Sequence, residues 1–233
     1  MARKTRVPDP PRRSHGPLRR TSQKDPAARA QRRRLLLLGA AGALVLVLAV
    51  GALAVTRGGG GDAASLLARA GCRLQSFPAV PNAPDHSDVP TLATRPKTWN
   101  STPPTSGPHY AVPAVWDFYD APVPLVQTVH NLEHGGIVIH YGPRVPTADV
   151  EELRAFWESD PDGLVVAPLA SNGSRITLSA WTVPDNLVGT ADRGRGWLAT
   201  CTRFDRDAFA AFVREHRFKG PERIDPSSER PGT

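Results

Sequence analysis

The stretch VHNLEHGGIVIHYGP, residues 129–143, contains three of the seven histidines of the chain and then continues into an apolar segment. His130 and His134 are four residues apart, a spacing that puts both imidazoles on one face of either a helix or a strand. Alternating and apolar residues predict strands at 125–129 (LVQTV) and 136–141 (GIVIHY), with a histidine-rich turn between them. His140 keeps an even spacing from His134, although two intervening glycines can break that register.

Clustered imidazoles are typical of transition-metal sites, because neutral histidine is the commonest protein ligand for zinc and also binds copper(II). His109, in SGPHY (106–110), follows a rigid Gly-Pro turn and is the expected third ligand. The sequence therefore predicts a site of His109, His130 and His134 that binds zinc or copper(II). The single Met, at position 1, excludes a thioether copper(I) site. Three further residues are supporting or alternative candidates: Glu133, His140 and His86.

Two other hypotheses for the histidines stay open. Histidines beside apolar strands also donate hydrogen bonds to backbone carbonyls, which would make this a structural or partner-binding cell-envelope module without a metal. Alternatively, Glu133 and His134 would act as general acid and base in an envelope enzyme. The sequence HNLEH differs from the HExxH pattern of zinc proteases, and no nucleophile elbow, phosphate loop or dinucleotide fingerprint is present.

Residues 35–55 form a run of 21 apolar or small residues without charge. A helix of this length extends about 31 Å, enough to cross a hydrocarbon core of about 30 Å. Residues 32–34 are all arginine, whereas the far side carries only Arg57 before a glycine run. The positive-inside rule therefore predicts a single-pass protein of the cell membrane, with a cytoplasmic N-terminus and an extracytoplasmic C-terminal domain. Cleavage after Ala54, as in a signal peptide, is the alternative.

Charge is distributed unevenly along the chain. Residues 1–34 hold twelve of the 29 Lys and Arg and two of the 22 Asp and Glu, a net charge of +10, which leaves −3 for the rest. The first segment has almost no large apolar side chains and is predicted to be a disordered cytoplasmic tail. The slightly acidic remainder indicates no nucleic-acid partner. We expect a Gly-rich linker at 56–61, one domain at 62–224 and a disordered tail at 225–233.

The two cysteines, Cys72 and Cys201, are separated by most of the predicted domain. Outside the reducing cytoplasm, a lone pair of cysteines is most simply a disulfide. Two free buried thiols are the alternative. We therefore predict that the bond joins the beginning of the domain to its last strand or helix.

Residues 77–124 contain eleven prolines, which exclude long helices and central strands. The same segment carries five large aromatic side chains that favour burial over disorder. These are Trp99, Tyr110, Trp116, Phe118 and Tyr119. The composition predicts an ordered, extended segment that wraps around the domain.

The remaining pattern predicts an α+β domain. Apolar spacings of three and four indicate helices at 62–71, at 147–160 with Thr147 as the cap, and from Asp205 onward. Strands are expected at 163–169 and 175–183, which would form a hairpin, and at 196–204. This order favours a mostly antiparallel sheet with helices on one face, a long Pro-rich wrapping segment and a single transmembrane helix before it.

Two longer motifs carry a family resemblance: NSTPPTSGPHY at 100–110 and HNLEHGG at 130–136, accompanied by Gly71-Cys72 and by GPE at 220–222. With them the chain resembles the domain of unknown function family 3105 over about residues 65–224. The resemblance implies a single-pass membrane or secreted protein and brings no established activity. Its motifs include His109, His130, Glu133 and His134. The segment DHSDVP (85–90) is longer than the family pattern, which makes His86 the weaker ligand candidate.

Overall fold

The computed structural model describes residues 61–83 and 86–231. The predicted cytoplasmic tail (1–34) and membrane span (35–55) lie outside these residues. Within the described ranges, no helix is both long enough and apolar enough to cross a bilayer.

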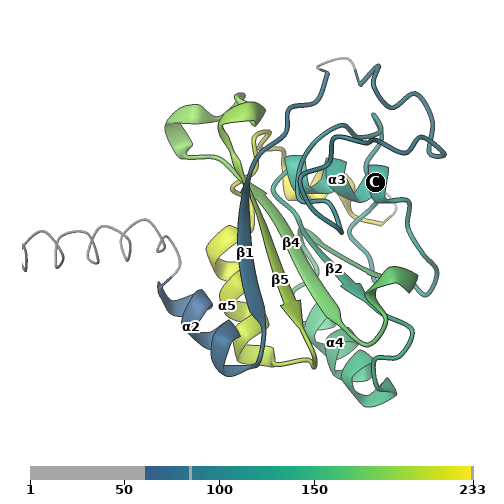
Figure 1. Cartoon of the computed structure of the whole chain (residues 1–233), viewed down its shortest axis with the longest axis vertical. Coiled ribbons are helices and arrows are strands. Elements are labelled where there is room, and N and C mark those ends of the chain that lie inside the picture. Colours follow the sequence, from purple (N-terminus) through teal and green to yellow (C-terminus); the bar gives the residue numbers. More distant parts are fainter. Residues whose placement is uncertain (1–60, 84–85, 232–233) are drawn as a thin grey trace, which may run out of the picture. The chain divides into compact units, whose positions relative to one another are not determined.

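A five-stranded mixed sheet forms the centre of the fold (Figure 1), with the strand order β1-β5-β4-β2-β3. Three of the neighbouring pairs are antiparallel, and only β2 and β3 are parallel. An α+β fold with a mostly antiparallel sheet is therefore confirmed. The strands are β1 (Arg73–Pro78), β2 (Ile137–Tyr141), β3 (Leu164–Pro168), β4 (Ile176–Thr182) and β5 (Arg195–Cys201).

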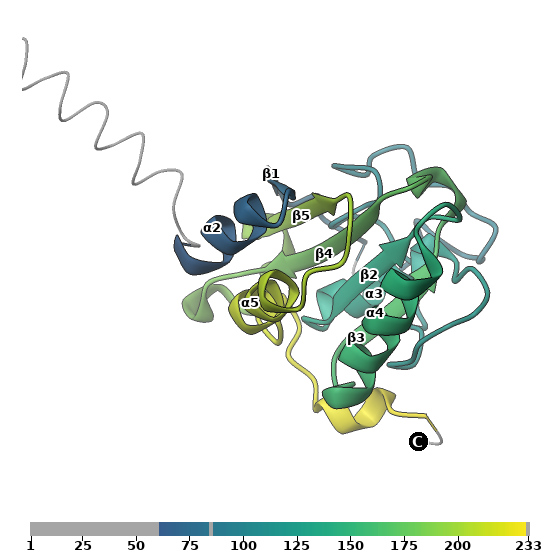
Figure 2. The ribbon, with the colours of Figure 1, turned by 90° about the horizontal axis from the view of Figure 1, so that it is seen from below.

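Helices cover both faces of the sheet, so the prediction of helices on one face is wrong. On one side, α2 (Gly61–Arg69), α4 (Thr147–Ser159) and α5 (Arg206–His216) share a core with Ile137 and Ile139 of β2. Figure 2 shows these three helices along one side of the sheet. On the other side, α3 (Leu125–Glu133) packs Val129 and Leu132 against Val138. Because successive side chains of β2 point to opposite faces and are apolar on both, each face needs a cover.

The predicted strand 125–129 is wrong, because LVQTV forms the first turns of α3. Its β-branched residues resemble a strand, but Val126, Val129 and Leu132 recur every three residues and are all buried, as on one face of a helix. The helix ends at His134, and Gly135 follows with a φ of +82°. His140 therefore belongs to a separate element, and the continuous strand from His134 does not exist.

The predicted hairpin of 163–169 and 175–183 is also wrong. Both strands exist as β3 and β4, but each pairs with β2 and neither pairs with the other. The helix α4 connects β2 to β3 as a parallel crossover, which inserts β2 between them. Strand β1 is not predicted by the sequence analysis, since it lies at the sheet edge and ends at Pro78.

The predicted final helix is confirmed as α5, with Asp205 accepting a hydrogen bond from the backbone N–H of Ala208 at 3.0 Å. Gly71, with a φ of +80°, follows the end of α2 as expected. Thr147 is the first residue of α4 rather than its cap, because Pro146 occupies the cap position without a side-chain bond.

Cys72 and Cys201 form the predicted disulfide, with their Cα atoms 4.1 Å apart. Cys72 precedes β1 and Cys201 ends β5, and both belong to the core beneath α2 and α5. The bond therefore ties the edge strand to its neighbour and closes 129 residues of chain.

The Pro-rich segment is ordered, as predicted. The amide of Asn100 donates to Ser106 Oγ at 2.7 Å, and Ser106 Oγ accepts from the Val80 N–H at 2.9 Å. Further along, the N–H of Tyr119 donates to the carbonyl of Val166 in β3 at 2.7 Å. These contacts hold Val80, Ser106 and Tyr119 on the domain, and SGPHY lies next to α3, where the N–H of Tyr110 donates to the carbonyl of Val126 at 3.0 Å.

The C-terminal residues 225–231 differ from the predicted disordered tail, since they fold back onto the domain. They contain the 3-10 helix η4 (Pro226–Glu229). The indole N–H of Trp116 donates to the carbonyl of Pro226 at 2.9 Å, and Glu229 is buried. Hydrogen bonds to residues far away in the sequence hold this segment on the domain, and local composition does not reveal such contacts.

Candidate metal centre

His86, His109, His130 and Glu133 each offer a potential ligand atom, and these atoms all lie within 4.8 Å of one another. The helix α3 supplies two of the residues, and the Pro-rich segment supplies the other two. His109 is fully buried, His130 and Glu133 are each 5% exposed, and His86 is half-buried. This buried group can hold a metal ion.

Backbone carbonyls fix the orientation of two imidazoles. His109 Nδ1 lies 2.8 Å from the carbonyl oxygen of Gly107, and His130 Nδ1 lies 2.7 Å from that of Tyr110. A carbonyl only accepts, so each Nδ1 carries the proton and donates it. In the neutral ring this leaves the lone pair on Nε2, which is the tautomer that binds a metal through Nε2.

Both Nε2 atoms then face a second acceptor. His109 Nε2 lies 2.8 Å from Glu133 Oε2, and His130 Nε2 lies 3.0 Å from His134 Nε2. The Nδ1 of His134 donates to the carboxylate of Glu229, so its Nε2 also carries a lone pair in the neutral ring. In each of these two contacts, both facing atoms carry a lone pair. A positive charge must therefore lie between them, either a proton or a metal ion.

Electrostatics favour an ionised carboxylate beside a neutral imidazole. The pKa of His130 is lowered to about 4, mainly by burial and also by the adjacent His109 and His134, against the hydrogen bond to Tyr110 and the charge of Glu133. Burial raises the pKa of Glu133, but the hydrogen bond with His109 and the surrounding histidines bring it below its ordinary value. At neutral pH, His130 therefore presents a lone pair and Glu133 a negative charge.

Glu229 is a site residue that the sequence analysis does not find. Its carboxylate accepts from His134 Nδ1 and, at 2.9 Å, from Asn131 Nδ2. Asn131 in turn donates to the carbonyl of Ala114 at 2.6 Å. Glu229 thus fixes the ring of His134 and joins α3 to the C-terminal segment. It lies 95 residues from His134, so no local pattern could have indicated it.

A family model described as "Protein of unknown function (DUF3105)" matches residues 93–229. The chain belongs to this family. The suspected resemblance is confirmed, and the DUF3105 match includes His109, His130, His134 and Glu229 but begins after His86. No curated protein and no solved structure matches the chain.

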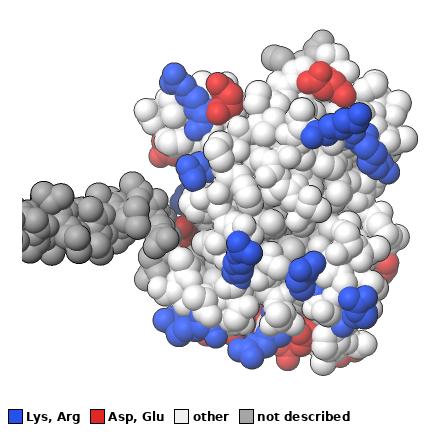
Figure 3. All heavy atoms as spheres, in the orientation of Figure 1, with Lys and Arg blue, Asp and Glu red and all other residues white. Residues whose placement is uncertain are grey.

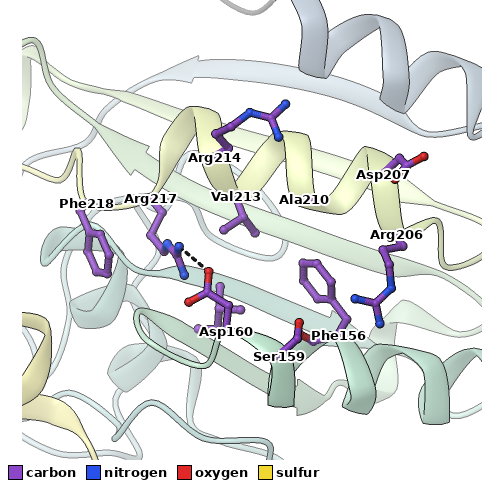
Figure 4. Close-up of a pocket in the computed structure, with 11 residues that line it drawn as sticks. Phe156, Ser159, Asp160, Arg206, Asp207, Ala210, Val213, Arg214, Arg217 and Phe218 are labelled. Carbon is purple, nitrogen blue, oxygen red and sulfur yellow. Dashed lines mark hydrogen bonds and ion pairs between the residues drawn. The ribbon is translucent and has the colours of Figure 1, made fainter.

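A depression of about 670 Å³ in this DUF3105 protein lies between α4 and α5 (Figure 4). Its apolar side chains include Phe156 and Val213, and Arg217 pairs with Asp160 across it at 2.6 Å. No histidine lines this depression. Neither Glu133 nor His134 lines it, and the hypothesis of an envelope enzyme that uses these two residues stays a prediction.

His140 lies in β2 outside the histidine group, and neither of its ring nitrogens has a hydrogen-bond partner among the described residues. Burial lowers its pKa to about 4. The folded protein therefore resists protonation of this ring, whereas the unfolded chain binds a proton near pH 6.5.

We expect His140→Leu to keep or raise stability at pH 7, because it removes two unpaired polar atoms at similar volume. As the pH falls from 6.5 to 4, the ring of His140 binds a proton in the unfolded chain more readily than in the folded protein. This lowers the free energy of unfolding of the wild type by roughly 3 kcal/mol, and the variant, which lacks the ring, does not lose it. Urea unfolding at pH 7 and pH 4 measures the difference, and His216, with its pKa also lowered to about 4 by burial, contributes equally to both proteins. A variant that unfolds at pH 7 would show that His140 has a structural partner or a ligand.

We expect Glu229→Gln to lower the free energy of unfolding by about 2 to 3 kcal/mol, because it removes charge-assisted hydrogen bonds from a buried carboxylate. Glu222→Gln is the matched control, since its carboxylate is largely exposed and lies 3.6 Å from His134 Nε2. Equal losses in the two variants in urea unfolding would contradict the anchoring role of Glu229.

Proposed function

We propose that this protein binds a zinc or copper(II) ion at the histidine group of α3 and the SGPHY segment. The observation that carries the proposal is the group of potential ligand atoms from His86, His109, His130 and Glu133, which lie within 4.8 Å of one another, with His109 Nε2 2.8 Å from Glu133 Oε2. Ligand atoms around a tetrahedral zinc ion lie about 3.3 Å apart, since zinc–nitrogen bonds are about 2.0 to 2.1 Å. The spacings at this group, 2.8 Å between His109 Nε2 and Glu133 Oε2 and up to 4.8 Å overall, bracket that value.

The proposed ligands are His109 and His130, through Nε2, with Glu133 as the oxygen donor. His86 is the proposed fourth ligand, because its Nε2 is buried and has no hydrogen-bond partner among the described residues. Its φ of 57° is uncommon outside glycine, and such backbone conformations concentrate at functional sites. The sequence analysis preferred His134, which remains an alternative ligand beside His130. Imidazole-rich donor sets suit zinc and copper(II).

We further propose that residues 35–55 anchor the domain in the cell membrane with its C-terminal part outside the cytoplasm. The support is the uncharged 21-residue run after three arginines. The disulfide between Cys72 and Cys201 fits an oxidising compartment.

A structural module without metal is the second candidate, and the two bonds to backbone carbonyls favour it. His130 holds the Pro-rich segment to α3 through the carbonyl of Tyr110 whether or not an ion is present, and the bond of His109 to Gly107 fixes the His109 ring within that segment. In that case a proton lies between each pair of facing atoms. The two candidates therefore differ in what carries the positive charge.

Metal analysis separates the two candidates. Full-length protein purified without chelator is expected to hold about one zinc or copper ion per chain. Adding the metal to chelator-treated protein is expected to raise the unfolding temperature, because the ion binds only the folded state. Protein with no stoichiometric metal and no thermal shift would support the structural module.

A further inference from the structure

The face of the sheet opposite α4 and α5, which is turned towards the viewer in Figure 1, carries a second polar cluster. Direct partners across antiparallel strands share a face. Arg73 of β1 is opposite Thr200 of β5, which is opposite Thr177 of β4, which is opposite His140 of β2. A polar row thus crosses four strands where an apolar surface would be expected.

Part of this row lines a depression of about 310 Å³. Two arginines lie on it, Arg73 from β1 and Arg175 from the turn before β4. Among the described residues, neither guanidinium forms an ion pair or a side-chain hydrogen bond. None of the lining residues is acidic. In Figure 3 the acidic side chains of this face lie towards its edges. The other lining residues are Gln75, Thr102, Ser171, Asn172, Thr177, Leu198 and Thr200.

The hydroxyl of Thr177, which lines this depression, accepts a hydrogen bond from Asn172 and can donate one of its own. Asn172 Nδ2 donates to Thr177 Oγ1 at 2.9 Å and to the carbonyl of His140 at 2.9 Å. The hydroxyl of Thr177 therefore accepts from Asn172 and keeps its own proton to donate. Thr177 lines the depression and is only 3% exposed.

We propose that this depression binds a tetrahedral oxyanion of charge −2, such as the phosphoryl group of a small phosphate ester. Two guanidiniums and a hydroxyl that can donate hydrogen bonds line the same depression, and no carboxylate lines it. Arginine pairs with such oxygens through two parallel hydrogen bonds. Two positive charges match a phosphate monoester, which carries about −1.5 to −2 at pH 7, better than a carboxylate. The volume of about 310 Å³ leaves room for the organic part of the ester.

Titration of the full-length protein with inorganic phosphate at constant ionic strength tests this proposal. We expect saturable binding that Arg73→Gln or Arg175→Gln each weakens about tenfold or more, because each removes charge-assisted hydrogen bonds. Thr177→Val is expected to weaken binding about threefold or more at nearly unchanged volume. Acetate, with a single charge, is expected to bind more weakly than phosphate.

The double variant Arg73→Gln/Arg175→Gln is the reference, because residues 1–34 carry a net charge of +10 and are expected to attract phosphate as well. Binding present in the wild type and lost in this variant belongs to the depression. Arg193→Gln is the matched control, since it removes an exposed arginine outside the depression. Equal binding by the wild type and the double variant, equal weakening by Arg193→Gln, or acetate binding as tight as phosphate would overturn the proposal.

Discussion

Full-length protein carrying His130→Asn is expected to lose its bound metal, with an affinity for zinc or copper(II) reduced about 100-fold or more. Residues that only support metal ligands already contribute about 10- to 100-fold, so a ligand itself should exceed that range. The ring of His130 also lies beside three other imidazoles, with ring centroids 5.1 Å from His86, 4.8 Å from His109 and 4.4 Å from His134. His109→Asn should have a similar effect.

Competition with a chromophoric chelator measures the affinity, and circular dichroism shows whether each variant is folded. His140→Leu is the matched control, because it removes a buried imidazole that lies outside the group. A folded His130→Asn variant that binds metal as tightly as the His140→Leu control would contradict the ligand assignment.

The double variant Cys72→Ala/Cys201→Ala is expected to lose about 4 to 5 kcal/mol of stability. The disulfide closes a loop of 129 residues, and in the chain-entropy model the size of that loop sets the free energy. The bond also ties the edge strand β1 to β5. Without the bond, only one row of backbone hydrogen bonds pairs β1 with β5. Urea unfolding measures the loss.

Reductant provides the control for this prediction. Dithiothreitol should lower the stability of the wild type to about that of the double variant and should leave the variant unchanged. If the oxidised wild type and the double variant unfold at the same urea concentration, the disulfide has no stabilising role.

The sequence predicts elements whose signals are local. The final helix was predicted from Asp205 and the spacing of its buried residues, and the structure has both. The pair His130 and His134 shares a face for either a helix or a strand, so that prediction survives the wrong secondary structure of 125–129. The proximity of His109 to α3 followed from a rigid turn in an ordered segment, and the structure places it 2.8 Å from Glu133.

Features that depend on contacts between distant segments could not be predicted. Val126 and Val129 favour a strand locally, but packing on the sheet makes them one face of α3. The position of β2 between β3 and β4 arises from the crossover through α4 rather than from any turn signal. Glu229 joins the site only because the C-terminal segment folds back onto α3. Glu133 was only a supporting or alternative candidate in the sequence analysis, and the fold brings its carboxylate to His109 across 24 residues.

Anomalous diffraction from crystals of the full-length protein, grown with zinc or copper(II) and measured at the absorption edge of the metal, tests the metal site most directly. We predict one strong anomalous peak within about 2.0 to 2.2 Å of Nε2 of His109, Nε2 of His130 and a carboxylate oxygen of Glu133. Crystals exposed to both metals that show no peak between these atoms, with the rings of His109 and His130 still bonded to Gly107 and Tyr110, would contradict it.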